Sequence, residues 1–196
     1  MLLRKYFFPS LLNLVKTIGR RVLKIVTPKK NGYILVASQV HDYRELLMGG
    51  IANMSRGDYR VVLAVVPFVD AVTTMLDASI PLTTREYTEW GNPNVKSDYE
   101  RMLSWSPYDN VGRHAYPAMY VYTGLWDSQV QYYEPTKWVA KLRADKTGDN
   151  PLVLRVNMEG GHGGPAGRFQ QAKSRAEYLA FALWELGYSP GRSLLE

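Results

Sequence analysis

"YRVVLAVVP", residues 59–67, is the stretch that decides the fold class of this chain. It is rich in valine and too short for a long core helix, and it lacks the alternation of apolar and polar residues that marks a half-exposed strand. A run of this kind predicts a strand that is buried on both faces. Such strands are typical of parallel sheets that helices cover on both sides.

The segments around this strand repeat a pattern of short strand and longer helix. Further strands are predicted from "YILVAS" (33–38), "AMYVYTG" (118–124) and "PLVLRV" (151–156), and helices over 45–55, 134–146 and 170–187. Gly49 and Gly50 are expected to allow close packing of the first helix, and residues 68–117, with several prolines, are predicted to be irregular. The alternation predicts an α/β domain with a mostly parallel sheet flanked by helices.

The composition is that of one folded domain, with 46% apolar and 21% charged residues over a length of 196. There is no cysteine, which excludes disulfides and thiolate zinc sites and fits a reducing compartment, so we expect a cytoplasmic protein. We expect neither a cofactor nor a metal.

The net charge of +6 belongs to one arm of the chain, residues 1–30. This arm holds eight basic residues and no acidic residue. Of the 24 basic and 18 acidic residues in the whole chain, the rest of the chain therefore has 16 basic and 18 acidic residues. The near-neutral remainder argues against nucleic acid as a partner. Apolar residues recur in the arm at close to helical spacing. It is interpreted either as a basic amphipathic helix suited to an anionic membrane or a transit peptide, or as a remnant without a role.

Two chemically suggestive loops follow successive predicted strands. Asp127 lies in "TGLWDSQV" after one strand, and His162 lies in "NMEGGHGG" after the next. Because active groups of parallel sheets sit at the carboxyl ends of strands, these loops are expected to meet at one edge. A carboxylate beside an imidazole fixes the ring tautomer and stabilises its charged form, which is half of the machinery that activates a hydroxyl nucleophile.

Several long strings carry a resemblance to a known family. "VVPFVDAVTTMLDASIPLTTREYTEWGNPN", "SWSPYDNV", "PAMYVYTGLWDSQVQYYEPTKWVAKLR" and "GGHGGPAGRF" occur in the same order as in the catalytic domain of oligopeptidase B. The chain therefore resembles the trypsin-like serine peptidases of the prolyl oligopeptidase family over about residues 46–187. The resemblance implies an α/β-hydrolase domain, in which Asp127 and His162 match the aspartate and histidine of the catalytic triad.

The resemblance also sets the expected domain organisation. Family members carry a β-propeller that allows only short peptides to reach the active site. No stretch of this chain is predicted to form a β-propeller. Residues 46–196 are expected to be the carboxyl-terminal part of the peptidase domain. Residues 1–45 are expected to be an atypical basic segment that does not descend in frame from the peptidase.

The nucleophile of the family is missing from the sequence. No G-x-S-x-G motif occurs, although its glycines are needed for the tight turn that exposes the serine. The family's turn runs into a helix that begins "LLMG", here residues 46–49, and counting back places Asp42 at the serine position. Ser38 is interpreted as a strand residue. An Asp42 nucleophile, as in haloalkane dehalogenases of the same fold, is the alternative to an inactive site.

The substrate side of the site is better preserved. In the family, acidic residues after "PLTT" hold the arginine or lysine that precedes the cleaved bond, and a carboxylate suits a guanidinium group. Glu86 in "TTREYTEW" matches the principal acid. Thr88 stands where relatives have a second acid, and Glu89 is adjacent. The resemblance thus implies short peptides with basic residues as ligands, whereas the oligomeric state is left open.

Two functions follow as hypotheses. The first is an inactive fragment of a serine endopeptidase that cleaves after arginine or lysine, with Asp127, His162 and Glu86 retained. The second is a non-catalytic peptide-binding or membrane-associating protein that uses residues 1–30 as an anchor.

Overall fold

The computed structural model of the chain describes residues 33–37, 42–54 and 59–187, with the backbone alone for 33–37, 42–45 and Leu47. One sheet of four parallel strands, in the order β1-β2-β3-β4, organises this part of the chain. The strands are β1 (Tyr33–Ala37), β2 (Tyr59–Val65), β3 (Ala118–Gly124) and β4 (Leu152–Asn157). The predicted parallel sheet is confirmed.

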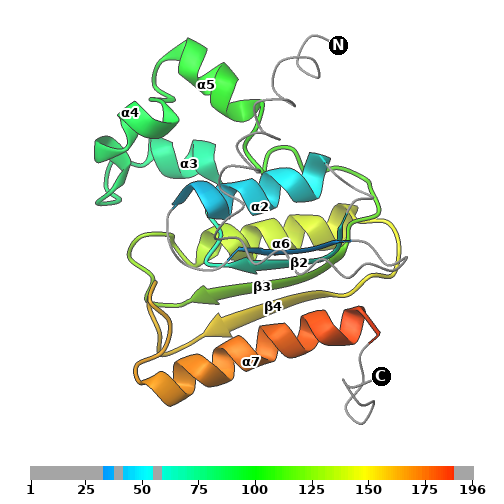
Figure 1. Ribbon diagram of the computed structural model, residues 1–196. Helices are drawn as coiled ribbons and strands as arrows, with labels where there is room; N and C mark the ends of the chain where they lie inside the picture. The colour runs from blue at the N-terminus through cyan, green and yellow to red at the C-terminus, as the bar shows by residue number, and fades with distance from the viewer. Residues whose placement is uncertain (1–32, 38–41, 55–58, 188–196) are drawn as a thin grey trace.

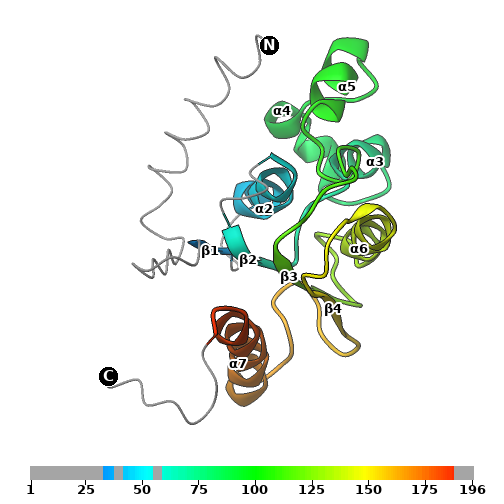
Figure 2. The same cartoon turned by 90° about the vertical axis from the view of Figure 1, so that its right-hand side faces the viewer.

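Helices cover both faces of this sheet, as Figures 1 and 2 show. One face carries α2 (Asp42–Met54) and α6 (Tyr133–Asp145), and the other carries α7 (Arg168–Glu185). A helical connection joins each strand of the β1–β4 order to the next, so the strands run in the same direction.

Alternate residues of β2 pack into two separate cores. Val62 and Ala64 belong to the core beneath α2 and α6, where Trp138 is fully buried. Val61 and Leu63 belong to the core beneath α7. Because successive side chains of a strand point to opposite faces, a run without polar residues fits a strand covered on both sides.

The segment 68–117 differs from its prediction as an irregular region. It contains α3 (Ala71–Leu76), the 3-10 helix η1 (Thr83–Arg85), α4 (Tyr87–Trp90) and α5 (Lys96–Leu103). Helices this short complete too few turns for an apolar period to be recognised in the sequence. They pack around Phe68, Trp90 and Met102 in a third core, which lies beyond α2 and away from the sheet (Figures 1 and 2).

The two glycines of α2 have different roles. A Cβ atom added to Gly49 would lie 2.5 Å from Cβ of Pro107, so this glycine permits the close approach of α2 to the long segment. A Cβ atom added to Gly50 would meet nothing within 4 Å. Only Gly49 therefore has the predicted packing role.

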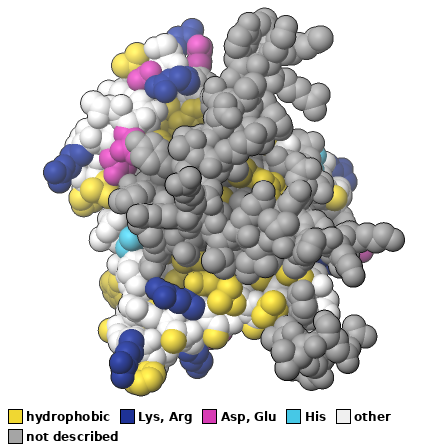
Figure 3. All heavy atoms as spheres, in the orientation of Figure 1, with side chains coloured by type: hydrophobic (Ala, Val, Ile, Leu, Met, Phe, Trp, Pro, Cys, Tyr) yellow, Lys and Arg dark blue, Asp and Glu magenta, His cyan; other side chains and the backbone are white. Residues whose placement is uncertain are grey.

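The outer side of α7 is partly apolar. Phe169, Leu183 and Trp184 are exposed on this helix, and Figure 3 shows hydrophobic and basic side chains together in this part of the surface. Within the described ranges, none of the helices has the length and apolar character needed to cross a membrane. The basic arm, residues 1–30, lies outside the described residues.

Candidate active site

The carboxyl ends of β3 and β4 lie side by side, as the arrowheads in Figure 1 show. Asp127 follows β3 and His162 follows β4. Nδ1 of His162 lies 3.0 Å from Oδ2 and 3.2 Å from Oδ1 of Asp127. The structure therefore brings together the two residues that the sequence singled out, whereas their catalytic roles stay a prediction.

Asp127 is held in place by its own turn. Its side chain is fully buried, and Oδ1 accepts hydrogen bonds of 2.9 Å from the backbone N–H groups of Gln129 and Val130. Aspartate commonly closes turns in this way, because its short side chain reaches the backbone two and three residues ahead. The carboxylate is thus fixed in orientation before His162 contacts it.

Glycine residues let the two loops approach each other. A Cβ atom on Gly124 would lie 2.4 Å from the carbonyl oxygen of Gly160, and one on Gly161 would lie 2.9 Å from that of Trp126. In return, the backbone N–H of Trp126 donates to the carbonyl of Gly160 over 3.1 Å. The absence of side chains at these positions is therefore what permits the contact between Asp127 and His162.

The loop that carries His162 is held by the side chain of Asn157, the last residue of β4, and by a backbone hydrogen bond within the loop. Oδ1 of Asn157 accepts hydrogen bonds of 2.9 Å from the N–H groups of Glu159 and Gly160. Gly164, with φ +82°, closes the loop by donating its N–H to the carbonyl of Gly161 over 2.9 Å. The His162 side chain keeps 21% of its surface exposed, so the ring stays accessible at the edge of the sheet.

The chemistry of the pair follows from its donors and acceptors. An ionised carboxylate only accepts hydrogen bonds, so Asp127 favours the ring form of His162 with the hydrogen on Nδ1. The other ring nitrogen is then the basic one, which is the arrangement that accepts a proton from a hydroxyl group. No group of three His, Asp or Glu side chains suited to a metal ion occurs in the described part of the chain.

Glu86 lies at the junction of η1 and α4, in the long segment after β2. Its Oε2 accepts a hydrogen bond of 3.0 Å from Nε1 of Trp90. Glu86 lines a small pocket together with Thr74, Gln129 and Val130. The last two residues belong to the turn around Asp127, so the pocket adjoins the loop of the Asp–His pair. Thr88 and Glu89, the neighbours considered in the sequence, are exposed.

The position matched to the family's serine lies at the start of α2. The backbone of Asp42 is the first residue of this helix, which follows β1. Ser38 and the rest of residues 38–41 lie outside the described residues, and so does the side chain of Asp42. The expectation of an aspartate in place of the nucleophile therefore stays a prediction.

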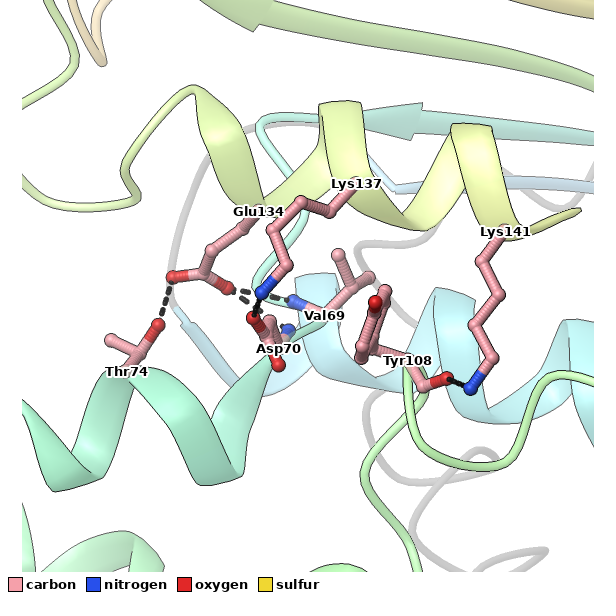
Figure 4. Close-up of polar contacts among 7 residues, drawn as sticks. All are labelled: Val69, Asp70, Thr74, Tyr108, Glu134, Lys137 and Lys141. Atoms are coloured by element: carbon pink, nitrogen blue, oxygen red, sulfur yellow. Dashed lines mark hydrogen bonds and ion pairs between the residues drawn. The ribbon is translucent and has the colours of Figure 1, made fainter.

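A buried polar cluster between α6 and the start of the long segment after β2 was not predicted from the sequence. Figure 4 shows this cluster. Glu134 at the start of α6 and Asp70 before α3 are both completely buried. Burial raises the pKa of Glu134 to about 7, although hydrogen bonds from Thr74 and from the backbone of Asp70 favour the carboxylate. Nζ of Lys137 lies 2.5 Å from Oδ2 of Asp70. The only sequence signal was a glutamate directly before Pro135 at a helix start, which normally marks an exposed first turn.

Comparison with known proteins gives the same family over most of the chain. A sequence profile described as the prolyl oligopeptidase family matches residues 46–189. "Dipeptidyl aminopeptidase BI" of Pseudoxanthomonas mexicana is 61% identical over 142 residues, which are 72% of this chain and 20% of that protein. "Protease 2" of Moraxella lacunata is 53% identical over 150 residues, which are 76% of this chain and 22% of that protein.

Solved structures of oligopeptidase B are similar in fold. The enzyme from Leishmania major aligns with a TM-score of 0.73 and 48% identity, over 74% of this chain and 20% of that one. The enzyme from Trypanosoma brucei with covalently bound antipain aligns with a TM-score of 0.74 and 44% identity, over 78% and 21%. The chain thus spans about a fifth of the length of these relatives. On the combined match of profile, sequence and fold, the chain belongs to the prolyl oligopeptidase family of serine peptidases.

Proposed function

We propose that this chain is the part of an oligopeptidase that binds short peptides through a basic side chain and carries the acid–base pair of the catalytic triad. The observation that carries the proposal is the contact between Nδ1 of His162 and the buried carboxylate of Asp127, 3.0 Å apart, at the carboxyl ends of neighbouring parallel strands. In α/β folds this edge of the sheet is where catalytic loops gather.

The roles of the two residues follow from acyl-transfer chemistry. His162 would take the proton of an attacking hydroxyl and later give it to the leaving amine, while Asp127 holds the ring and stabilises its positive charge. The hydroxyl oxygen would form a bond to the carbonyl carbon of the peptide, and the amine would leave. Water would then hydrolyse the resulting ester by the same proton transfers.

The hydroxyl group for this sequence of steps is missing at the matched position. Asp42 stands there, and the residues around it, "VHDYRELLMG", include no glycine of the usual turn before the helix. We propose that no acyl-enzyme forms on this chain and that it binds basic peptides without cleaving them. An ester trapped on Asp42 would instead support the alternative of an aspartate nucleophile.

Glu86 is proposed as the receptor of the arginine or lysine side chain. Three features support this role: it matches the family's principal acid, it lines a pocket with Gln129 and Val130, and these two residues also donate hydrogen bonds to Asp127. A carboxylate at this place would pair with a guanidinium group through two charge-assisted hydrogen bonds. The basic residue would thereby be placed beside the Asp–His pair.

The division of the chain is proposed to lie between residues 45 and 46. The family profile begins at residue 46, which supports this boundary. Residues 1–45 are proposed to be an atypical segment with no counterpart in the peptidase. Attachment to membranes through the basic residues 1–30 is the alternative function. Co-sedimentation with anionic vesicles that is lost on deletion of residues 1–30 would favour it.

Hydrolysis and binding assays together test the proposal. The full chain is incubated with arginyl and lysyl esters, and separately titrated with the tripeptide Ala-Arg-Ala and with its counterpart in which uncharged citrulline replaces arginine. We expect no ester turnover above that of the His162→Ala variant, and tighter binding of the arginine peptide that is lost in Glu86→Gln. Turnover that disappears in His162→Ala would refute the absence of catalysis. Equal binding of the two peptides would refute the role of Glu86.

A further inference from the structure

One face of α6 contacts both ends of the long segment that carries Glu86. Glu134, Lys137 and Lys141 lie on this face at spacings of three and four residues, so they project in the same direction (Figure 4). Glu134 and Lys137 reach the region of Val69 to Thr74, where the segment begins. Lys141 donates a hydrogen bond of 3.0 Å to the carbonyl of Tyr108, near the end of the segment.

The carboxylate of Glu134 makes the densest set of contacts on this face. Its Oε2 accepts hydrogen bonds from the backbone N–H groups of Val69 over 3.2 Å and of Asp70 over 3.0 Å. Its Oε1 accepts a hydrogen bond of 2.6 Å from the hydroxyl of Thr74. All of these groups are buried, so each would be left without a partner if the side chain were truncated.

A continuous series of hydrogen bonds leads from Glu134 to Glu86. The hydroxyl of Thr83 donates to the carbonyl of Thr74 over 3.0 Å, and the backbone N–H of Glu86 donates to the carbonyl of Thr83 over 3.2 Å. Thr74, Thr83 and Glu86 line the same small pocket. The position of Glu86 is thus linked through backbone groups to a buried side chain on another element.

Neighbouring charges hold the face of α6 against this region. Lys137 pairs with the buried carboxylate of Asp70, and its Nζ lies 4.7 Å from the centre of the Tyr108 ring. Lys141 lies at the same distance from this ring. Because α6 begins just after the turn around Asp127, it fixes the long segment relative to the Asp–His pair.

We propose that Glu134 is a positioning residue for the basic-residue pocket: it sets the place of Glu86 relative to Asp127 and His162 through Thr74 and Thr83. The inference rests on the proposed binding of basic peptides. It assigns the specificity of that site in part to a residue that does not contact the ligand.

Two substitutions at Glu134 distinguish the effect of its hydrogen bonds from the effect of its negative charge. Glu134→Ala removes all three acceptor contacts. Glu134→Gln has the shape of the protonated acid: its amide oxygen can accept from the N–H groups of Val69 and Asp70, and its NH₂ can donate to the Thr74 hydroxyl. The glutamine variant should therefore keep the pocket intact if the role of Glu134 is geometric.

The test measures the ratio of affinities for Ala-Arg-Ala and its citrulline counterpart, by calorimetric titration of the full chain. We expect Glu134→Ala to reduce this ratio by about tenfold or more, which corresponds to about 1.4 kcal/mol. Glu134→Gln should restore it to near the wild-type value. Val139→Ala is the matched control, because it weakens the core under the same helix and lies outside the polar contacts of Figure 4.

Thr74→Val provides a second test that does not depend on the folding of Glu134→Ala. It removes only the hydroxyl that donates to Glu134. We expect a smaller loss of arginine preference and faster hydrogen exchange of the Trp90 indole N–H, which donates to Glu86. The inference fails if Thr74→Val leaves both quantities unchanged, or if Val139→Ala lowers the preference as much as Glu134→Ala.

Failure of the inference can be told apart from failure of the proposed function. If the wild-type chain prefers arginine and Glu86→Gln abolishes the preference, the proposed function stands whatever the Glu134 variants do. If the wild-type chain binds both peptides equally, the proposed function falls and the inference falls with it.

Discussion

The carboxylate of Asp127 contacts Nδ1 of His162 through both of its oxygens while Oδ1 also accepts two backbone N–H groups of its own turn. The same buried side chain therefore holds a loop together and orients an imidazole. Substitutions of Asp127 therefore affect both the turn, through the two backbone N–H groups, and the candidate site, through His162.

Asp127→Ala is expected to lower the free energy of unfolding by about 2 kcal/mol, since it leaves the buried N–H of Val130 and the partly buried N–H of Gln129 without an acceptor. Asp127→Asn keeps one oxygen for these donors and should cost less. Urea unfolding of both variants measures the difference. Asp149→Ala, at an exposed aspartate, is the control and should change the free energy by no more than about 0.5 kcal/mol. Equal losses for Asp127→Ala and Asp149→Ala would contradict the role of the turn.

Gly124→Ala is expected to separate the two loops of the site. The added methyl group would lie 2.4 Å from the carbonyl oxygen of Gly160, and both atoms are attached to backbone, so the loops must move apart. We expect a loss of about 1–3 kcal/mol in the free energy of unfolding. The cross-peaks between the Asp127 and His162 side chains in NMR spectra should also weaken.

Gly50→Ala is the matched control for this substitution. Its methyl group would meet nothing within 4 Å, and Gly50 lies inside α2. Because alanine is favoured over glycine within helices, the variant should gain about 0.5–1 kcal/mol in stability. If both alanine variants changed the free energy of unfolding in the same direction, the close approach of the two loops would not explain why glycine is needed at position 124.

Glu134 is expected to make the stability of the fold depend on pH between about 4.5 and 7. Burial raises its pKa from the ordinary 4.5 to about 7, so the folded state holds a proton that the unfolded state releases. The corresponding stabilisation is complete below pH 4.5 and is lost as the pH rises through about 7. A shift of this size corresponds to about 3 kcal/mol.

Comparison with Glu134→Gln isolates this contribution. Urea unfolding at pH 5 and pH 8 should show a larger fall in stability for the wild-type chain than for the variant, because only the wild-type chain has an ionisable carboxyl group at residue 134. Asp70, Tyr133 and Lys137 are the charged or titratable groups that interact with Glu134, and they are present in both proteins. Parallel pH profiles for the two chains would show that Glu134 does not titrate in this range.

Lys137→Met is expected to destabilise the fold by about 3 kcal/mol, because it leaves the buried carboxylate of Asp70 without its cation. The double variant Asp70→Asn with Lys137→Met should recover part of this loss, since the amide carries no charge. Lys141→Met, which removes a hydrogen bond to the carbonyl of Tyr108 and a contact with its ring but no ion pair, is the control and should cost less. Thermal unfolding of the wild-type chain, Asp70→Asn, Lys137→Met and the double variant gives the coupling energy, and a value near zero would exclude the ion pair as a stabilising contact.

The sequence predicted the sheet and the loops of the candidate site well for a local reason. Valine-rich runs such as residues 59–67 have no polar face, so they fit only a strand covered on both sides. Once the strands were placed, Asp127 and His162 had to follow neighbouring carboxyl ends. The short helices of residues 68–117 were missed, because four to eight residues do not establish a helical period.

By itself, the sequence determined the family, the α/β class and the order of the two loops, because these depend on local patterns and on motifs that are read along the chain. Only the tertiary structure decided that Asp127 contacts His162 and that Glu134 is buried among backbone donors 64 and 65 residues away. Glutamate is usually exposed, and a single chain carries no local mark of the donors that compensate its burial. Such pairings arise when helices dock on the sheet and exclude water, which makes an unpaired polar group costly and leaves only the satisfied arrangement stable.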